Sequence, residues 1–185
     1  MHITKQTLSF YRESQQPVSL SLSDILDNVV ELQSRKLQLN RITLEKDFRT
    51  AGRISGFSVE LRQVFLNIIS NAIQAMPEGG RLRLKLTESR ARNGHSGIRV
   101  EIGDTGVGIK REHAEKIFEP FFSTKDVKGT GLGLWISRGI IQKYGGAIRF
   151  RTARLNSGNV TCFSVFIPGA AIEESQPMVT AALSA

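Results

Sequence analysis

The sequence contains one cysteine, Cys162, in 185 residues, so no disulfide bond can form within the chain. Cys162 lies in the apolar run VTCFSVFI, and we expect a buried core thiol in a reducing compartment. The single tryptophan, Trp135, is also expected in the core. No apolar run approaches the roughly 20 residues of a membrane-spanning helix, and no signal peptide opens the sequence. We therefore predict a cytoplasmic domain and leave open whether a parent protein is anchored in a membrane.

The sequence also lacks a clustered basic stripe, although it is basic as a whole. It carries 25 Lys and Arg against 17 Asp and Glu, a formal net charge of +8. The basic residues are scattered, and aromatic residues do not alternate with them, as a nucleic-acid-binding surface would require. We interpret the charge as that of a solvated surface and predict no nucleic-acid partner.

Length and composition favour one folded domain with short appendages. The apolar fraction of 40% and the charged fraction of 23% are ordinary for a globular protein, and 185 residues can bury one sizeable core. Residues 17–168 carry the periodic patterns of helices and strands. Residues 1–16 resemble the end of a helix stopped by Pro17, and residues 169–185 lack periodicity and are predicted to be disordered.

Three main helices and several strands are predicted between these appendages. The helices are expected from the N-cap Ser23 to about residue 39, from the N-cap Ser58 to Met76, and from Leu132 to Tyr144. Alternating patterns predict strands at 42–48, 81–88, 97–104, 147–152 and 160–167, after a short extended piece at 18–22. The glycine-rich stretch 51–57 has no clear pattern of either kind. This pattern of helices and strands indicates an α+β fold, a two-layer α/β sandwich whose mixed sheet is mainly antiparallel.

Two asparagines interrupt the apolar helix QVFLNIISNAIQAM at residues 63–76. Asn67 and Asn71 are four residues apart, so both amides lie on one helix face. Burying an amide without partners costs free energy. Either residue alone would more often be a satisfied core or surface amide, but the pair suggests a polar ligand face.

Two glycine clusters follow in the second half of the chain, DTGVGI at 104–109 and GTGLGL at 129–134. The second runs directly into a helix, where free backbone amides and close-approaching glycines can cradle phosphate groups. Between them, FEPFFSTKDVKG offers Lys125 and Lys128 as positive charges. Each feature alone has an ordinary structural explanation, since glycines serve turns and lysines are usually solvated.

The amides, Asp104 and GTGLGL together suggest a site for a nucleotide and a metal ion. An amide oxygen is an acceptable ligand for Mg²⁺, which keeps several waters and bridges to phosphates. Asp104 stands at a strand end, where its carboxylate could accept a hydrogen bond from an adenine amino group.

These segments resemble the four sequence boxes of the catalytic, ATP-binding domain of bacterial sensor histidine kinases. QVFLNIISNAIQAM matches the N box, DTGVGI the first glycine box, FEPFFSTK the phenylalanine box and GTGLGL the second glycine box, in the family's order. The wider superfamily includes DNA gyrase and heat-shock chaperones. The resemblance implies the Bergerat-type ATP-binding fold and the cofactors ATP and Mg²⁺.

The resemblance also implies a role for each matching residue. Asn71 matches the Mg²⁺ ligand, Asn67 a contact to the phosphates and Asp104 the aspartate that recognises adenine, with Gly106 and Gly108 shaping its pocket. Residues 119–130 match the mobile lid over ATP, and Lys125 is expected to contact the γ-phosphate. The other nucleotide-binding residues implied are Phe118, Gly129, Thr130, Gly131, Leu132 and Gly133.

The chain departs from the family pattern in two places. Many relatives have a basic residue at Gln74, so the phosphate contact there would be weaker and Lys125 more important. None of His2, His95 and His113 lies in the family's phosphoacceptor motif. Residues 1–16 instead resemble the end of a dimerisation helix. We therefore expect a fragment that follows the phosphoacceptor and does not phosphorylate itself when alone.

The implied function is donation of the ATP γ-phosphoryl group to a histidine on an upstream helical domain, for relay to an aspartate of a response regulator. The expected partners are therefore the histidine-containing dimerisation domain of the same protein and a receiver domain, with a homodimeric parent protein. Two alternatives stay open: an ATP-hydrolysing member of the superfamily and a serine kinase of the anti-sigma type. Hydrolysing relatives carry Glu at the position of Asn67, and an amide cannot take up a proton from water.

Overall fold

The computed structural model describes residues 16–91, 94–123, 130–155 and 158–169. The predictions for the helix end at 1–15, for 170–185, and for Lys125, Lys128 and Gly129 lie outside the described residues. In chain order the elements are β1 (Val18–Ser21), α1 (Leu22–Leu39), β2 (Ile42–Phe48), β3 (Arg53–Gly56), α2 (Ser58–Ala75), β4 (Gly80–Arg90), β5 (Ser96–Asp104), the short 3₁₀ helix η2 (Arg111–His113), α3 (Gly133–Lys143), β6 (Ala147–Leu155) and β7 (Gly158–Pro168).

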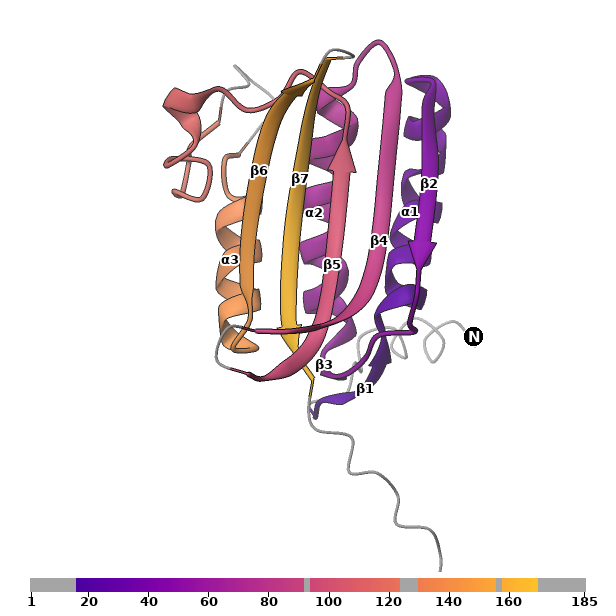
Figure 1. Cartoon of the computed structure of the whole chain (residues 1–185), viewed down its shortest axis with the longest axis vertical. Helices are drawn as coiled ribbons and strands as arrows, with labels where there is room; N and C mark the ends of the chain where they lie inside the picture. The colour runs from indigo at the N-terminus through magenta and orange to yellow at the C-terminus, as the bar shows by residue number, and fades with distance from the viewer. Residues whose placement is uncertain (1–15, 92–93, 124–129, 156–157, 170–185) are drawn as a thin grey trace, which may run out of the picture.

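Five strands form one sheet in the order β2-β4-β5-β7-β6, and β1 pairs with β3 in a small second sheet. The pairing of β2 with β4 is parallel, whereas the other pairs are antiparallel. All three α-helices lie behind the large sheet in Figure 1, so the two-layer α+β prediction is confirmed. None of the helices in the described ranges is long and apolar enough to cross a membrane.

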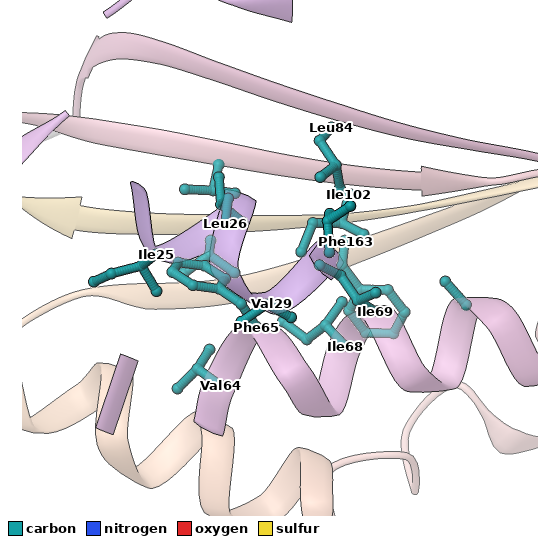
Figure 2. Close-up of a cluster of buried hydrophobic side chains, with 14 of the residues drawn as sticks. Ile25, Leu26, Val29, Val64, Phe65, Ile68, Ile69, Leu84, Ile102 and Phe163 are labelled. Atoms are coloured by element: carbon teal, nitrogen blue, oxygen red, sulfur yellow. The ribbon is translucent and has the colours of Figure 1, made fainter. Parts of the chain in front are cut away.

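The core lies between the helices and the inward face of the sheet. Along β4, Leu82, Leu84 and Leu86 are fully buried while Arg83 between them is exposed, the alternation expected of a sheet covered on one side. Phe65 of α2 is also fully buried. Figure 2 shows residues of α1, α2 and the sheet that meet in this layer: Ile25, Leu26, Val29, Val64, Phe65, Ile68, Ile69, Leu84, Ile102 and Phe163.

Both predicted helix caps are wrong. The N-cap of α1 is Ser21, whose Oγ accepts from the backbone N–H of Asp24 at 3.3 Å, and not Ser23. The cap of α2 is Phe57, which makes no side-chain cap bond, so Ser58 is already helical. The backbone N–H of Phe57 donates to the Tyr144 hydroxyl at 2.8 Å, which fixes the start of α2 through a contact distant in sequence.

Two other core predictions are also wrong. Trp135 is 48% exposed on the first turn of α3. Cys162 is half-buried, because β7 turns Thr161 and Phe163 inward and therefore turns Cys162 to the open face of the sheet. Burial raises the pKa of the Cys162 thiol, which disfavours a reactive thiolate.

Candidate functional site

A cleft of about 760 Å³ opens between α2, the start of α3, the loop after β5 and the inward face of β7. This volume lies within the range of about 300–1,000 Å³ typical of small-molecule sites. The cleft is lined by Asn67, Ser70, Asn71, Ala72, Gln74, Ala75, Asp104, Val107, Gly108, Ile109, Lys110, His113, Ile117, Phe122, Ser123, Thr130, Gly131, Gly133, Leu134, Thr161 and Phe163.

The cleft collects most of the predicted site residues that the structure describes. Those that line it are Asn67, Asn71, Asp104, Gly108, Thr130, Gly131 and Gly133, with Gln74 beside them. Gly106, Phe118 and Leu132 are not among the lining residues. Phe118 instead packs against Phe150, with ring centroids 6.2 Å apart, and lies under the guanidinium of Arg138. Of these two phenylalanines of the phenylalanine box, Phe122 lines the cleft and Phe118 does not.

Asn67 joins α2 to the first turn of α3. Its Nδ2 donates to the carbonyl of Gly133 at 3.0 Å and to the Ser137 hydroxyl at 3.1 Å. Ser137 is fully buried and donates in turn to the Gly133 carbonyl at 2.8 Å. The side chain that was predicted to contact phosphates therefore also holds the second glycine box against α2.

Asp104 lines the cleft from the last position of β5. Only 3% of the residue is exposed, and its Oδ1 accepts from the backbone N–H of Gly106 at 3.0 Å. Burial raises the pKa of the Asp104 carboxyl to about 6, and the Gly106 hydrogen bond opposes this shift. A ligand that donates a hydrogen bond to this carboxylate would replace the lost hydration and favour the charged form.

The first glycine loop packs against the C-terminal end of α2. The backbone N–H of Val107 donates to the carbonyl of Ala75 at 3.0 Å. A Cβ at Gly106 would collide with the backbone of Ala75, and Gly108 has a φ of +80°, which disfavours other residues. Both glycines of DTGVGI are therefore required by the backbone path beside the cleft.

The second glycine loop packs against the phenylalanine box at Phe121. Gly131 has a φ of +66°, and a Cβ there would collide with the backbone of Phe121. At Gly133, a Cβ would lie 3.3 Å from Cγ of Asn67. The glycines thus allow the start of α3 to approach α2 closely, with its N-terminal turn along the cleft.

Several lining residues escaped sequence analysis. Thr161 pairs in register with Asp104 across β5 and β7, but this pairing of strands far apart in sequence was not predicted. Lys110 lines the cleft, and its Nζ lies 3.8 Å from Oε1 of Glu112. The ring of His113 lies 5.5 Å from that of Phe122. Lys110 and His113 lie one and four residues after the first glycine box, so their proximity to it in sequence could have indicated them.

The residues that line the cleft could hold Mg²⁺ only together with oxygen atoms of a bound ligand. Within the described ranges, no group of three or more His, Cys, Asp or Glu could hold a metal ion. Asn71 lines the cleft and carries an amide oxygen, and one hard oxygen ligand completed by water and phosphate oxygens is a usual environment for Mg²⁺.

Known proteins are similar to this chain in sequence and in architecture. A family model described as Histidine kinase-, DNA gyrase B-, and HSP90-like ATPase matches residues 56–171. Sporulation kinase C of Bacillus subtilis is 37% identical over 149 residues, which cover 80% of this chain and 33% of that protein. Sensor kinase CckA of Brucella abortus is 35% identical over 179 residues, which cover 90% of this chain and 18% of that protein.

A solved structure of the catalytic domain of histidine kinase ThkA is also similar. It shares 30% sequence identity with this chain at a TM-score of 0.69, and the match covers 83% of this chain and 96% of that one. The chain thus spans a third or less of the two curated relatives but nearly the whole of a separate catalytic domain.

Proposed function

The chain belongs to the family of histidine kinase-, DNA gyrase B- and HSP90-like ATPases, as a catalytic domain of the sensor histidine kinase type, and we propose that it presents Mg²⁺-ATP to a histidine on another domain. The acceptor would lie on a helical dimerisation domain of the same protein, and a response regulator aspartate would receive the phosphoryl group afterwards. The parent protein would be a homodimer in the cytoplasm, with or without a membrane anchor.

One observation carries this proposal: a single cleft unites the helix of the paired amides with both glycine loops. Asp104 lines one part of the cleft from β5, while Gly131, Gly133 and the first turn of α3 line another part. A base that hydrogen-bonds to Asp104 would leave its phosphates free to reach the amides of α2 and the glycines before α3. A carboxylate, amides and glycine loops in one cleft are the groups that an adenine base and its phosphates would need.

The residues of this chain would bind and orient the nucleotide. Asn71 would hold Mg²⁺ through its amide oxygen, and the bound ion would neutralise charge on the phosphates. Backbone groups near Gly131 and Gly133 would hold the phosphate chain in a fixed direction. Phosphoryl transfer depends mainly on such positioning and charge neutralisation, so the acceptor imidazole can come from another domain.

Asn67 favours a kinase over an ATP hydrolase. Its two hydrogen bonds, to Gly133 and Ser137, are donated by the N–H groups of an amide, which a glutamate lacks. An amide also cannot take up a proton from an attacking water. The serine-kinase alternative differs in its product, because phosphohistidine is acid-labile and phosphoserine is not; acid-stable label on a protein substrate would favour it.

Calorimetric titration with ADP and with an ATP analogue tests the nucleotide site. We expect Asn71→Ala to weaken binding at least about tenfold in Mg²⁺, the cost of one lost contact to a charged group. The loss should be smaller in EDTA, because Asn71 is assigned to the metal ion. Asn28→Ala, on the exposed face of α1, is the matched control and should bind as the unaltered chain does. Equal affinities for all three proteins would refute the assignment.

A further inference from the structure

Asn159 of β7 reaches the first glycine loop from outside the sequence boxes. Its Nδ2 donates to the carbonyl of Val107 at 2.7 Å, across 52 residues of sequence. By strand alternation Asn159 shares a face of β7 with Thr161 and Phe163, which both line the cleft. The side chain also covers Gly108, because a Cβ at that glycine would lie 3.2 Å from the Cβ of Asn159.

The other anchors of this loop come from its own motif, from the backbone of α2 and from β4, where the Thr105 N–H donates to the carbonyl of Arg81 and the Thr105 hydroxyl accepts from the Arg81 N–H. Asp104 accepts from the N–H of Gly106, and the carbonyl of Ala75 accepts from the N–H of Val107. None of these anchors restrains the carbonyl side of Val107. Among the hydrogen bonds of the described residues, the one from Asn159 does so, and it ties the loop to β7, which also lines the cleft.

We propose that Asn159 is a positioning residue, which holds the first glycine loop in the shape that receives the adenine base. A loop with glycines at 106 and 108 has much conformational freedom to lose when a ligand binds. Asn159 reduces that cost by holding Val107 and Gly108 in place before the ligand arrives. This inference rests on the proposed function, since it assigns the Asp104 end of the cleft to adenine.

Titration of the full chain with adenosine and with ADP tests the role of Asn159. We expect Asn159→Ala to bind both ligands about fivefold more weakly, because the loop would then have to be ordered when the ligand binds. Asn159→Asp keeps the size of the side chain but cannot donate to a carbonyl when ionised. Its affinity for both ligands should therefore fall at least as much as that of Asn159→Ala. Asn28→Ala is again the control. The unfolding midpoint without ligand should change little, because the Asn159 contact is exposed.

The equal loss for adenosine and ADP distinguishes positioning of the base from an effect on the phosphates. Unchanged adenosine affinity in both Asn159 variants would overturn the inference while leaving the proposed function intact. Wild-type affinity in Asn159→Asp alone would show that packing, and not the hydrogen bond, acts here, which also overturns it. Failure of the unaltered chain to bind any adenine nucleotide would instead reject the proposed function, and the inference with it.

Discussion

At the scale of single residues, Asp104 combines a stability cost with a binding role. A carboxyl that is 3% exposed and has a pKa raised to about 6 is disfavoured in its charged form before a ligand arrives. In the unfolded chain the same carboxyl has a pKa near its ordinary value of about 4. Between these two values the folded protein binds more protons, so the Asp104 contribution to the free energy of unfolding falls as pH rises.

Replacing Asp104 by Asn should therefore stabilise the ligand-free protein near neutral pH. We expect Asp104→Asn to raise the free energy of unfolding by about 2 kcal/mol at pH 7, and by much less near pH 4, as this linkage requires. Urea denaturation at several pH values measures the difference. The same variant should lose adenine binding, and the wild type should bind ADP more weakly as pH falls below about 6. A variant that is less stable than wild type at every pH would contradict this account.

Asn67 shows what sequence analysis can and cannot provide at this scale. Its polarity within an apolar helix indicates a special role, because a buried amide needs partners. Its hydrogen-bond partners Gly133 and Ser137 result from the packing of α2 against α3, so the local sequence pattern does not identify them. Asp104 and the glycines could be identified from their boxes, whereas Thr161 and Asn159 required the strand pairing.

At the scale of elements, the start of α1 provides a direct test of a wrong prediction. Ser21, and not Ser23, caps the helix, and the N–H groups of Leu22 and Ser23 donate to Gly52 and Ala51. We expect Ser21→Ala to lower the free energy of unfolding by about 1 kcal/mol, as for other N-cap losses. Ser23→Ala should cost clearly less in the same denaturation experiment. A larger loss for Ser23→Ala would show that the sequence-based assignment was correct after all.

The errors in the elements have a common physical cause. Periodicity places the helices and the strands of the large sheet within a few residues, because alternating burial repeats along each element. The local pattern does not predict where a helix starts when its first hydrogen bonds go to distant segments, as in the bond from the Phe57 N–H to the Tyr144 hydroxyl at the start of α2. The strand β3 was missed because its hydrogen bonds go to β1, which is distant in sequence, while Gly52 and Gly56 obscure its short pattern.

At the scale of the whole molecule, the helix layer covers one face of the sheet and carries the ligand cleft at one end. The parts of the cleft come from distant segments, α2, the loop after β5, α3 and β7. A ligand that contacts all of them would be lost on unfolding, so its binding free energy would add to the stability of the entire domain.

Thermal unfolding with and without nucleotide therefore tests the cleft as one unit. At a concentration about 100-fold above its dissociation constant, ADP with Mg²⁺ should add about 2.7 kcal/mol to the free energy of unfolding. For a domain of this size the midpoint should rise by roughly 5–10 °C. Asp104→Asn should show no rise at the same ADP concentration, although its own midpoint without ligand should be higher than that of the wild type.

GDP serves as the control, because its base offers no amino group in the position of that of adenine. Equal stabilisation by ADP and GDP would mean that Asp104 does not select the base, and no stabilisation by either would mean that the cleft does not bind nucleotides.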